Sequence, residues 1–220
     1  MAARLSFDAE LKLLKEDLYE MARLIEAAIE KIMIAFENQD ENLAREIIQG
    51  DRIINDIEKA IEARCLSLIV KQQPVARDLR IVTTALKVVT DMERIGDHAA
   101  DIAELILRER REHIFDLVKH IPEMGKATKE MVHDAVEAFT TMNVEKAREI
   151  TKRDDIVDDL FDKVKLEVAN ILKSSSDHVD QCVDILMIAK YFERIGDHVV
   201  NICEWTEFHE TGSLNNIRIL

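Results

Sequence analysis

A six-residue segment that carries carboxylate, guanidinium and imidazole side chains occurs twice in this sequence. It reads Glu-Arg-Ile-Gly-Asp-His and runs from Glu93 to His98 and again from Glu193 to His198. In a helix, residues four positions apart lie on one face. Each copy therefore places its acids in a stripe, which comprises Glu93, Asp97 and Asp101 in the first copy and Glu193, Asp197 and Asn201 in the second.

Carboxylates at this spacing repel one another in an isolated helix. A bound cation would offset that repulsion, and closely set oxygen ligands suit iron, Mg²⁺, Mn²⁺ or Ca²⁺ better than zinc. The stripes are therefore predicted to bind metal ions, with zinc the less suitable ion.

Two other interpretations of the stripes stay open. The chain has 44 acidic residues, so acids four positions apart also arise as ordinary solvated helix faces. In addition, Arg94 and Arg194 lie three residues before Asp97 and Asp197, and Arg–Asp pairs at that spacing could neutralise the stripes without metal.

The apolar residues around the stripes recur at steps of three and four, which is typical of helices packed on one side. The pattern predicts a first helix over residues 11–35 and a second that begins near Leu43 or Asp51 and ends near Val70. A third helix is predicted to begin near Pro74, because proline suits the first helical turn. The same rhythm returns three times in the second half of the chain.

The two halves are copies of one unit. Residues 44–47 recur at 147–150, an offset of 103, whereas the six-residue segment recurs at an offset of 100. The change predicts that the loop before the third helix is three residues shorter in the second copy. We therefore predict an all-α fold of two tandem three-helix bundles, six antiparallel helices in all, over residues 1–112 and 120–220.

Counting residues along the chain predicts further metal ligands on the second helix of each bundle. Asp51 and Asp97 lie equally far from Pro74 along the sequence, one before it and the other after it. Because the two helices are antiparallel, equal lengths place these acids at one height, and Asn55 then lies opposite Glu93.

The second copy repeats this arrangement around a turn near Ser176. Asp154 precedes that turn by nearly the same length of chain as Asp197 follows it, and Asp158 falls opposite Glu193. The predicted metal ligands are Asp51, Glu93, Asp97, Asp101, Asp154, Asp158, Glu193 and Asp197.

Each repeated segment also contains a glycine and a histidine. Gly96 and Gly196 lie inside helices, where glycine costs about 1 kcal/mol relative to alanine, so we expect a neighbouring helix to approach closely there. His98 and His198 fall on the polar side of the apolar seam and are expected at the surface.

Composition narrows the classes of function. The net charge of −14 disfavours binding to nucleic acids, whose phosphates it repels. The cysteines Cys65, Cys182 and Cys203 show no metal-binding spacing and are expected to be buried free thiols. No signal peptide and no apolar run of about 20 residues is evident, so a cytoplasmic protein is expected.

The repeated segment, together with Gln-Pro-Val-Ala-Arg-Asp-Leu-Arg at residues 73–80, resembles the PhoU family over nearly the whole chain. The resemblance implies two three-helix bundles and a negative regulator of phosphate uptake and of the phosphate-starvation response. It also implies partners, namely subunits of the phosphate ABC transporter and a sensor histidine kinase, with contact to the membrane only through them. Some members bind multinuclear iron or other metals through Glu/Asp-x-x-x-Asp elements, which here are Glu93–Asp97 and Glu193–Asp197.

Two other classes of function stay open. The same carboxylates could serve a metal-dependent hydrolase or oxidase, although no glycine-rich phosphate loop, nucleophile elbow or zinc-protease motif is present. A purely structural dimerisation module is the third possibility. Leu24, Ile25 and Ala28 form a wide apolar stripe that predicts a homodimer or contact with membrane-bound subunits.

Overall fold

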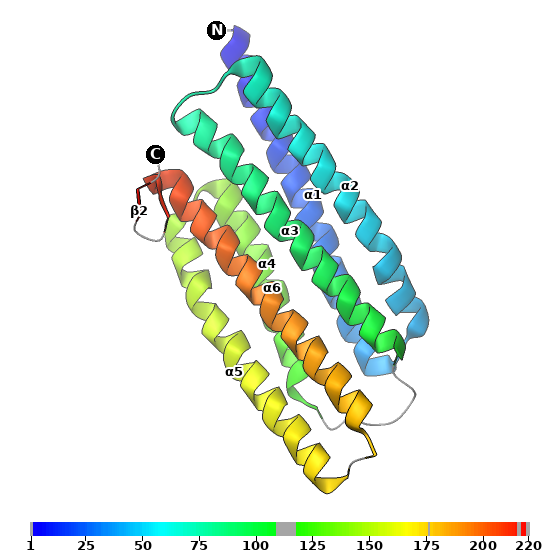
Figure 1. Ribbon diagram of the computed structural model, residues 1–220. Coiled ribbons are helices and arrows are strands. Elements are labelled where there is room, and N and C mark those ends of the chain that lie inside the picture. Colours follow the sequence, from blue (N-terminus) through cyan, green and yellow to red (C-terminus); the bar gives the residue numbers. More distant parts are fainter. Residues whose placement is uncertain (1, 109–117, 176, 215–216, 219–220) are drawn as a thin grey trace.

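The computed structural model of the protein describes residues 2–108, 118–175, 177–214 and 217–218. In this part of the chain, six long helices are followed by a hairpin of two very short strands (Figure 1). The predicted all-α fold with an internal repeat is confirmed. The two antiparallel strands contain only two residues each and do not change the fold class. The elements are α1 (Ala2–Asn38), α2 (Glu41–Gln72), α3 (Arg77–Arg108), α4 (His120–Thr141), α5 (Val144–Ser174), α6 (Val179–Thr211), β1 (Ser213–Leu214) and β2 (Ile217–Arg218).

The start of α2 is set by a capping residue. The side chain of Asp40 accepts hydrogen bonds from the backbone N–H groups of Asn42 and Leu43, at 3.0 and 3.1 Å. These bonds satisfy donors that have no partner within the helix. The helix therefore begins at Glu41, before the predicted Leu43 or Asp51.

The turn between α2 and α3 also differs from the prediction. Gln73 ends α2 in the left-handed conformation with a φ of 45°, and its N–H donates to the carbonyl of Ile69. Proline commonly follows such a cap because it cannot continue the helix. Pro74 accordingly lies in the turn, and α3 begins at Arg77, not at the proline.

The predicted shorter loop in the second repeat is wrong. Residues 73–76 join α2 to α3, and residues 175–178, of which 176 lies outside the described residues, join α5 to α6. Both connections thus span four residues. Relative to the first repeat, α5 ends one residue earlier and α6 begins two residues later, so the missing residues come from the helix ends.

The two three-helix units lie side by side and share one apolar core. Within the repeats α2 packs on α3 and α5 packs on α6, and between the repeats α3 packs on α6 and α1 packs on α4 (Figure 1). Buried residues of all six helices form one continuous cluster. Helices α3 and α6 thus contact each other across the repeat boundary and also contact the other helices of their own repeats.

The remaining structural expectations concern cysteines, membrane spans and domain limits. Cys65, Cys182 and Cys203 are buried and form no disulfide within the described residues, as predicted. Among the described residues, no helix combines the length and the apolar character that a membrane crossing requires. The domain limits of 1–112 and 120–220 stay predictions, and residue 112 lies outside the described residues.

Candidate metal centres

The structure brings Asp51 of α2 beside Asp97 of α3, as the count around Pro74 predicts. Burial, and then repulsion by Asp97, raise the pKa of Asp51, whereas a hydrogen bond from Asn55 Nδ2 to Asp51 Oδ2 at 2.9 Å opposes the rise. The other oxygen, Asp51 Oδ1, is buried and has no hydrogen-bond partner. Burial and then Asp97 also raise the pKa of Glu93. The first repeat thus gathers three acids, and burial and repulsion disfavour the charged forms of Asp51 and Glu93.

The second repeat also brings acids of its second and third helices together. Burial, and then repulsion by Asp158, Asp197 and Glu193, raise the pKa of Asp154 from 3.8 to about 6. Burial followed by the charge of Glu193 raises the pKa of Asp158 and of Asp197 as well. Asp155, just outside the predicted set, adds to the repulsion on Asp154.

The two glycines allow these acids to approach the third helix of each repeat. A Cβ atom on Gly96 would lie 3.1 Å from Ile54 and 3.5 Å from Asp51 Oδ1. A Cβ atom on Gly196 would lie only 2.5 Å from Asp154 Oδ1. The predicted close approach of a neighbouring helix is confirmed, and the approaching groups include the carboxylates themselves.

Cations of the chain neutralise the two clusters in part. Arg94 Nη1 donates to Asp97 Oδ2 at 2.8 Å, and Arg94 Nε lies 3.4 Å from Glu93 Oε2. The arginine pairing that the sequence left open therefore occurs in the first repeat. In the second repeat, Lys190 Nζ donates to Glu193 Oε1 at 2.6 Å. One cation per cluster leaves an excess of negative charge in both.

Asp101 and Asn201 occupy a different environment from the other stripe residues. Asp101 Oδ2 lies 3.4 Å from His98 Nδ1 on the same helix, although its charge still contributes to the raised pKa of Asp51. Asn201 Nδ2 instead donates across the repeat boundary to Asp91 Oδ1 at 3.0 Å. Asp101 is thus a predicted ligand that lies beside a histidine.

The expectation of surface histidines is wrong for His98, which is only 7% exposed. Its ring lies 5.5 Å from that of His198 and 5.4 Å from that of Tyr191. His198 Nδ1 lies 2.9 Å from Asp91 Oδ1 on α3. The polar side of each seam faces the other repeat, and burial there lowers the pKa of His98. The sequence signal for this contact was the histidine at the same position of both repeated segments.

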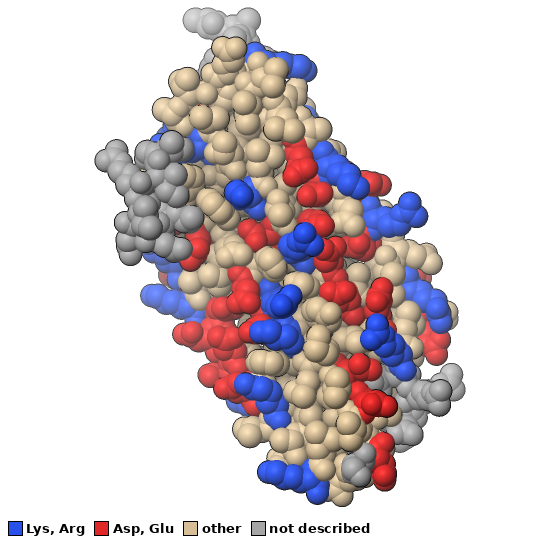
Figure 2. Space-filling view, in the orientation of Figure 1, with Lys and Arg blue, Asp and Glu red and all other residues tan. Residues whose placement is uncertain are grey.

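Acidic side chains crowd the middle of one face of the molecule. Figure 2 shows them over α2 and α3 on one side and over α5 on the other. The first cluster lies on α2 and α3, with Asp51 on α2 and Asp97 on α3, and the second lies on α5 and α6, with Asp154 on α5. The two candidate centres are thus built from the second and third helices of their repeats.

Comparison with known proteins decides the family. The model of the PhoU domain matches residues 18–106 and again residues 121–206. The chain belongs to the PhoU domain family. The two matched PhoU repeats coincide with the two helical units described above.

The sequences of related proteins align with this chain over nearly its whole length. The "phosphate-specific transport system accessory protein PhoU homolog" of Clostridium acetobutylicum is 44% identical, and the match covers 94% of each chain. The Escherichia coli K12 protein, named phosphate-specific transport system accessory protein PhoU, is 32% identical over 94% of this chain and 86% of its own. The crystal structure of the PhoU phosphate transport system regulatory protein from Streptococcus pneumoniae superimposes with a TM-score of 0.86 at 30% identity, covering 94% and 98% of the two chains.

The two PhoU repeats differ in charge at matched positions. The offset of 103 places Asn55 against Asp158 and Arg52 against Asp155. The second cluster therefore carries more negative charge on its second helix. Burial is the largest cause of the raised pKa of Asp154, and the charges of Asp158 and Asp155 add to it.

The donors of both PhoU repeats fit a hard cation in chemistry. They are carboxylate oxygens, burial and mutual repulsion raise the pKa values of Asp51, Glu93 and Asp154, and Asp51 Oδ1 is buried without a partner. Over the described part of the chain, however, no three His, Cys, Asp or Glu side chains converge closely enough to hold one ion. The eight predicted ligands therefore stay a prediction.

Proposed function

We propose that this protein is an accessory protein of the phosphate-specific transport system and a negative regulator of phosphate uptake and of the phosphate-starvation response. The observation that carries the proposal is the match over the whole length of the chain to proteins that bear this accessory name. Those relatives are named accessory or regulatory proteins, not enzymes, so we propose a regulatory protein without catalytic activity.

The proposal includes specific partners. The protein would act in the cytoplasm, where it would couple the phosphate ABC transporter to a sensor histidine kinase and reach the membrane only through these proteins. Its acidic surface and its net charge of −14 favour partners that present basic patches. We also propose a homodimer, which light scattering at high protein concentration tests, and a strict monomer would contradict it.

We further propose that the two carboxylate clusters bind metal ions. Asp51, Glu93 and Asp97 would hold the ion in the first repeat, with Asp101 at its edge. A bound hard cation, such as iron, Mg²⁺, Mn²⁺ or Ca²⁺, would supply the positive charge that Arg94 alone does not. In the second repeat the corresponding residues are Asp154, Asp158, Glu193 and Asp197.

A deletion strain tests the regulatory proposal. We expect loss of the gene to raise phosphate uptake and starvation-gene expression in phosphate-rich medium, and we expect the wild-type gene to restore control. Unchanged phosphate control after deletion would contradict the proposal. Elemental analysis of protein purified without chelator or affinity metal tests the metal centres separately, because regulation and metal content are measured independently.

A further inference from the structure

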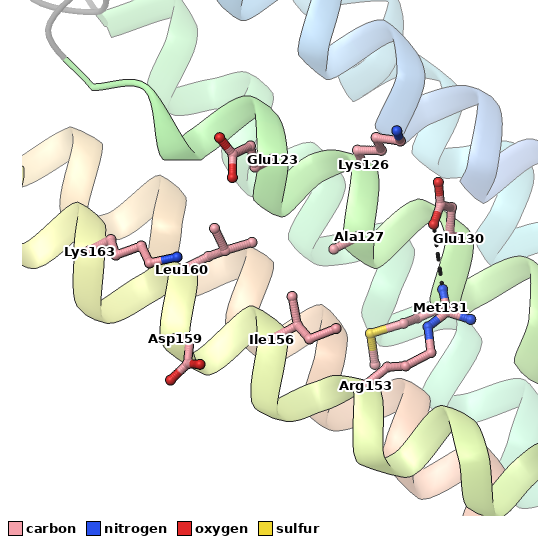
Figure 3. Close-up of a pocket in the computed structure, with 10 residues that line it drawn as sticks. All are labelled: Glu123, Lys126, Ala127, Glu130, Met131, Arg153, Ile156, Asp159, Leu160 and Lys163. Atoms are coloured by element: carbon pink, nitrogen blue, oxygen red, sulfur yellow. Dashed lines mark ion pairs between the residues drawn. The ribbon is translucent and has the colours of Figure 1, made fainter.

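The two repeats carry an open groove at the same place, between their first and second helices. The groove between α1 and α2 has a volume of about 500 Å³, and the groove between α4 and α5 has a volume of about 410 Å³ (Figure 3). The duplication of the chain extends to these surfaces, because five lining positions of one groove correspond, at the offset of 103, to lining positions of the other. They pair Leu24 with Ala127, Ala27 with Glu130, Ala28 with Met131, Gly50 with Arg153 and Ile53 with Ile156.

Each groove has an isoleucine at its edge. Ile53 is 55% exposed and Ile156 is 53% exposed, so about half of each residue faces water. Leu24 and Ala28 belong to the apolar stripe that predicts a homodimer, and both line the first groove. Ile25 of the same stripe is buried in the core. The stripe thus leaves part of its apolar surface outside the fold, in the same groove as Ile53.

Helices α2, α1, α4 and α5 form a row in which neighbours contact each other, and charges along this row are paired. The lining of the second groove contains acids and bases in equal number. Charge around the two grooves is therefore largely balanced, whereas the carboxylate clusters keep an excess of negative charge. The ion pairs that join neighbouring helices of the row include Lys31–Glu46 at 3.3 Å, Lys129–Glu30 at 3.0 Å and Arg153–Glu130 at 3.6 Å.

This balance of charge favours a second copy of the chain as the partner that covers the row. Two copies, each with a net charge of −14, repel each other in most orientations. In a two-fold dimer each patch meets the same patch of the other copy, so the patch must be complementary to itself. The row meets this condition, since its charges are balanced and it offers both projecting isoleucines and hollows that can receive them. A basic partner is attracted to the carboxylate clusters instead.

The row is also large enough for a stable dimer. Helix α4 contains 22 residues, and at 1.5 Å per residue it is about 33 Å long. Packed helices lie about 10 Å apart, so four in a row measure about 30 Å between the outer axes. The face therefore covers about 1,000 Å², compared with the about 800 Å² that each partner contributes to a stable interface.

We propose that a second copy of this chain covers the face formed by α1, α2, α4 and α5, with Ile53 and Ile156 of each copy packed into the grooves of the other. The inference rests on the proposed homodimer and names the surface through which it forms. Association would remove the two isoleucines and the apolar groove linings from water, and this burial would stabilise the dimer.

The test places a charge at each isoleucine. Ile53→Asp and Ile156→Asp change half-exposed positions, and melting curves verify that the variants fold. Leu66→Asp and Leu172→Asp are the matched controls, since these leucines are exposed on the same two helices and lie about 220° and about 160° around the helix axis from the isoleucines. Sedimentation equilibrium over a range of protein concentrations measures the dissociation constant of the dimer for each variant.

We expect Ile53→Asp and Ile156→Asp each to raise the dissociation constant of the dimer at least about tenfold, because each substitution removes an apolar contact twice in a two-fold dimer. We expect the variant with both substitutions to be monomeric over the same range of concentrations. The dissociation constants of Leu66→Asp and Leu172→Asp should stay within about twofold of the wild-type value.

The outcomes separate this inference from the proposed function. If wild-type protein is a strict monomer, the homodimer and this surface are both overturned, whereas the accessory role is decided by the deletion strain. If the isoleucine variants dimerise as well as wild type, the surface is overturned and the homodimer stands. If they dimerise normally but lose binding to the purified phosphate transport complex of the same organism, the face belongs to that complex and the proposal is overturned. If the leucine controls weaken the dimer equally, added charge alone explains the effect and the proposal is likewise overturned.

Discussion

Asp154→Asn in metal-free protein is the sharpest test of the carboxylate clusters. The pKa of Asp154 rises from 3.8 to about 6 on folding, so the folded state binds more protons than the unfolded state between these pH values. Stability of the apo protein therefore falls as the pH rises through this window. The shift corresponds to about 3 kcal/mol at 1.36 kcal/mol per pKa unit. Because the side chain is only half-buried, screening by water reduces this to about 1–2 kcal/mol.

We therefore expect Asp154→Asn to stabilise chelator-treated protein by about 1–2 kcal/mol at pH 7.5, which is about 2–8 °C in Tm for a chain of this size. The gain should be small near pH 4, where the wild-type carboxyl is protonated in the folded state and about half protonated in the unfolded state. With a bound cation the sign reverses, because the substitution then removes a ligand.

Thermal melts at pH 4 and pH 7.5, each with chelator and with added metal, measure these effects. Asp159→Asn is the matched control, since it removes the same charge from an exposed position of α5. If Asp154→Asn weakens the protein equally with and without metal, the carboxylate is held by favourable contacts within the chain, and repulsion within the cluster is refuted.

Three further predictions concern glycines, the repeat boundary and metal. Gly196→Ala is expected to lower stability by about 1–3 kcal/mol, because its Cβ atom would press on a carboxylate oxygen of α5. Gly50→Ala is expected to raise stability by up to about 1 kcal/mol. Chemical denaturation of both variants measures the difference. Asp91→Ala removes the group that lies beside His198 and accepts from Asn201, and a loss of about 1–3 kcal/mol in the same assay is expected. Metal at about 100 times its Kd is expected to stabilise wild-type protein by about 2.7 kcal/mol, and an unchanged melting curve would count against the metal centres.

The sequence alone determined the helices, their duplication and the level at which the acids meet. Helical periodicity is a local property, and a helix rises by a constant length per residue. Counting residues on either side of a turn therefore places Asp51 at the level of Asp97. Even the error at Pro74 did little harm, because the turn of residues 73–76 is centred within about one residue of Pro74.

The tertiary structure decided which cationic side chains pair with the acids. Arg94 reaches Asp97, but in the second repeat it is Lys190 that pairs with Glu193. Thr90 stands in the position of Lys190 in the first repeat, so identical segments met different neighbours. Repetition of a motif predicts its backbone, whereas its ion pairs depend on side chains outside the motif.

Sequence periodicity did not predict how the two repeats pack against each other. His98 is polar and lies beside the seam of its own bundle, yet it is buried because α6 covers that side of α3. Likewise, a Cβ atom at Gly50 of α2 would meet nothing within 4 Å, whereas Arg153 at the matched position of α5 lies 3.6 Å from Glu130 Oε2 of α4 (Figure 3). Local patterns specify which face of a helix is apolar, but contacts between residues about 100 positions apart decide which polar faces are buried against each other.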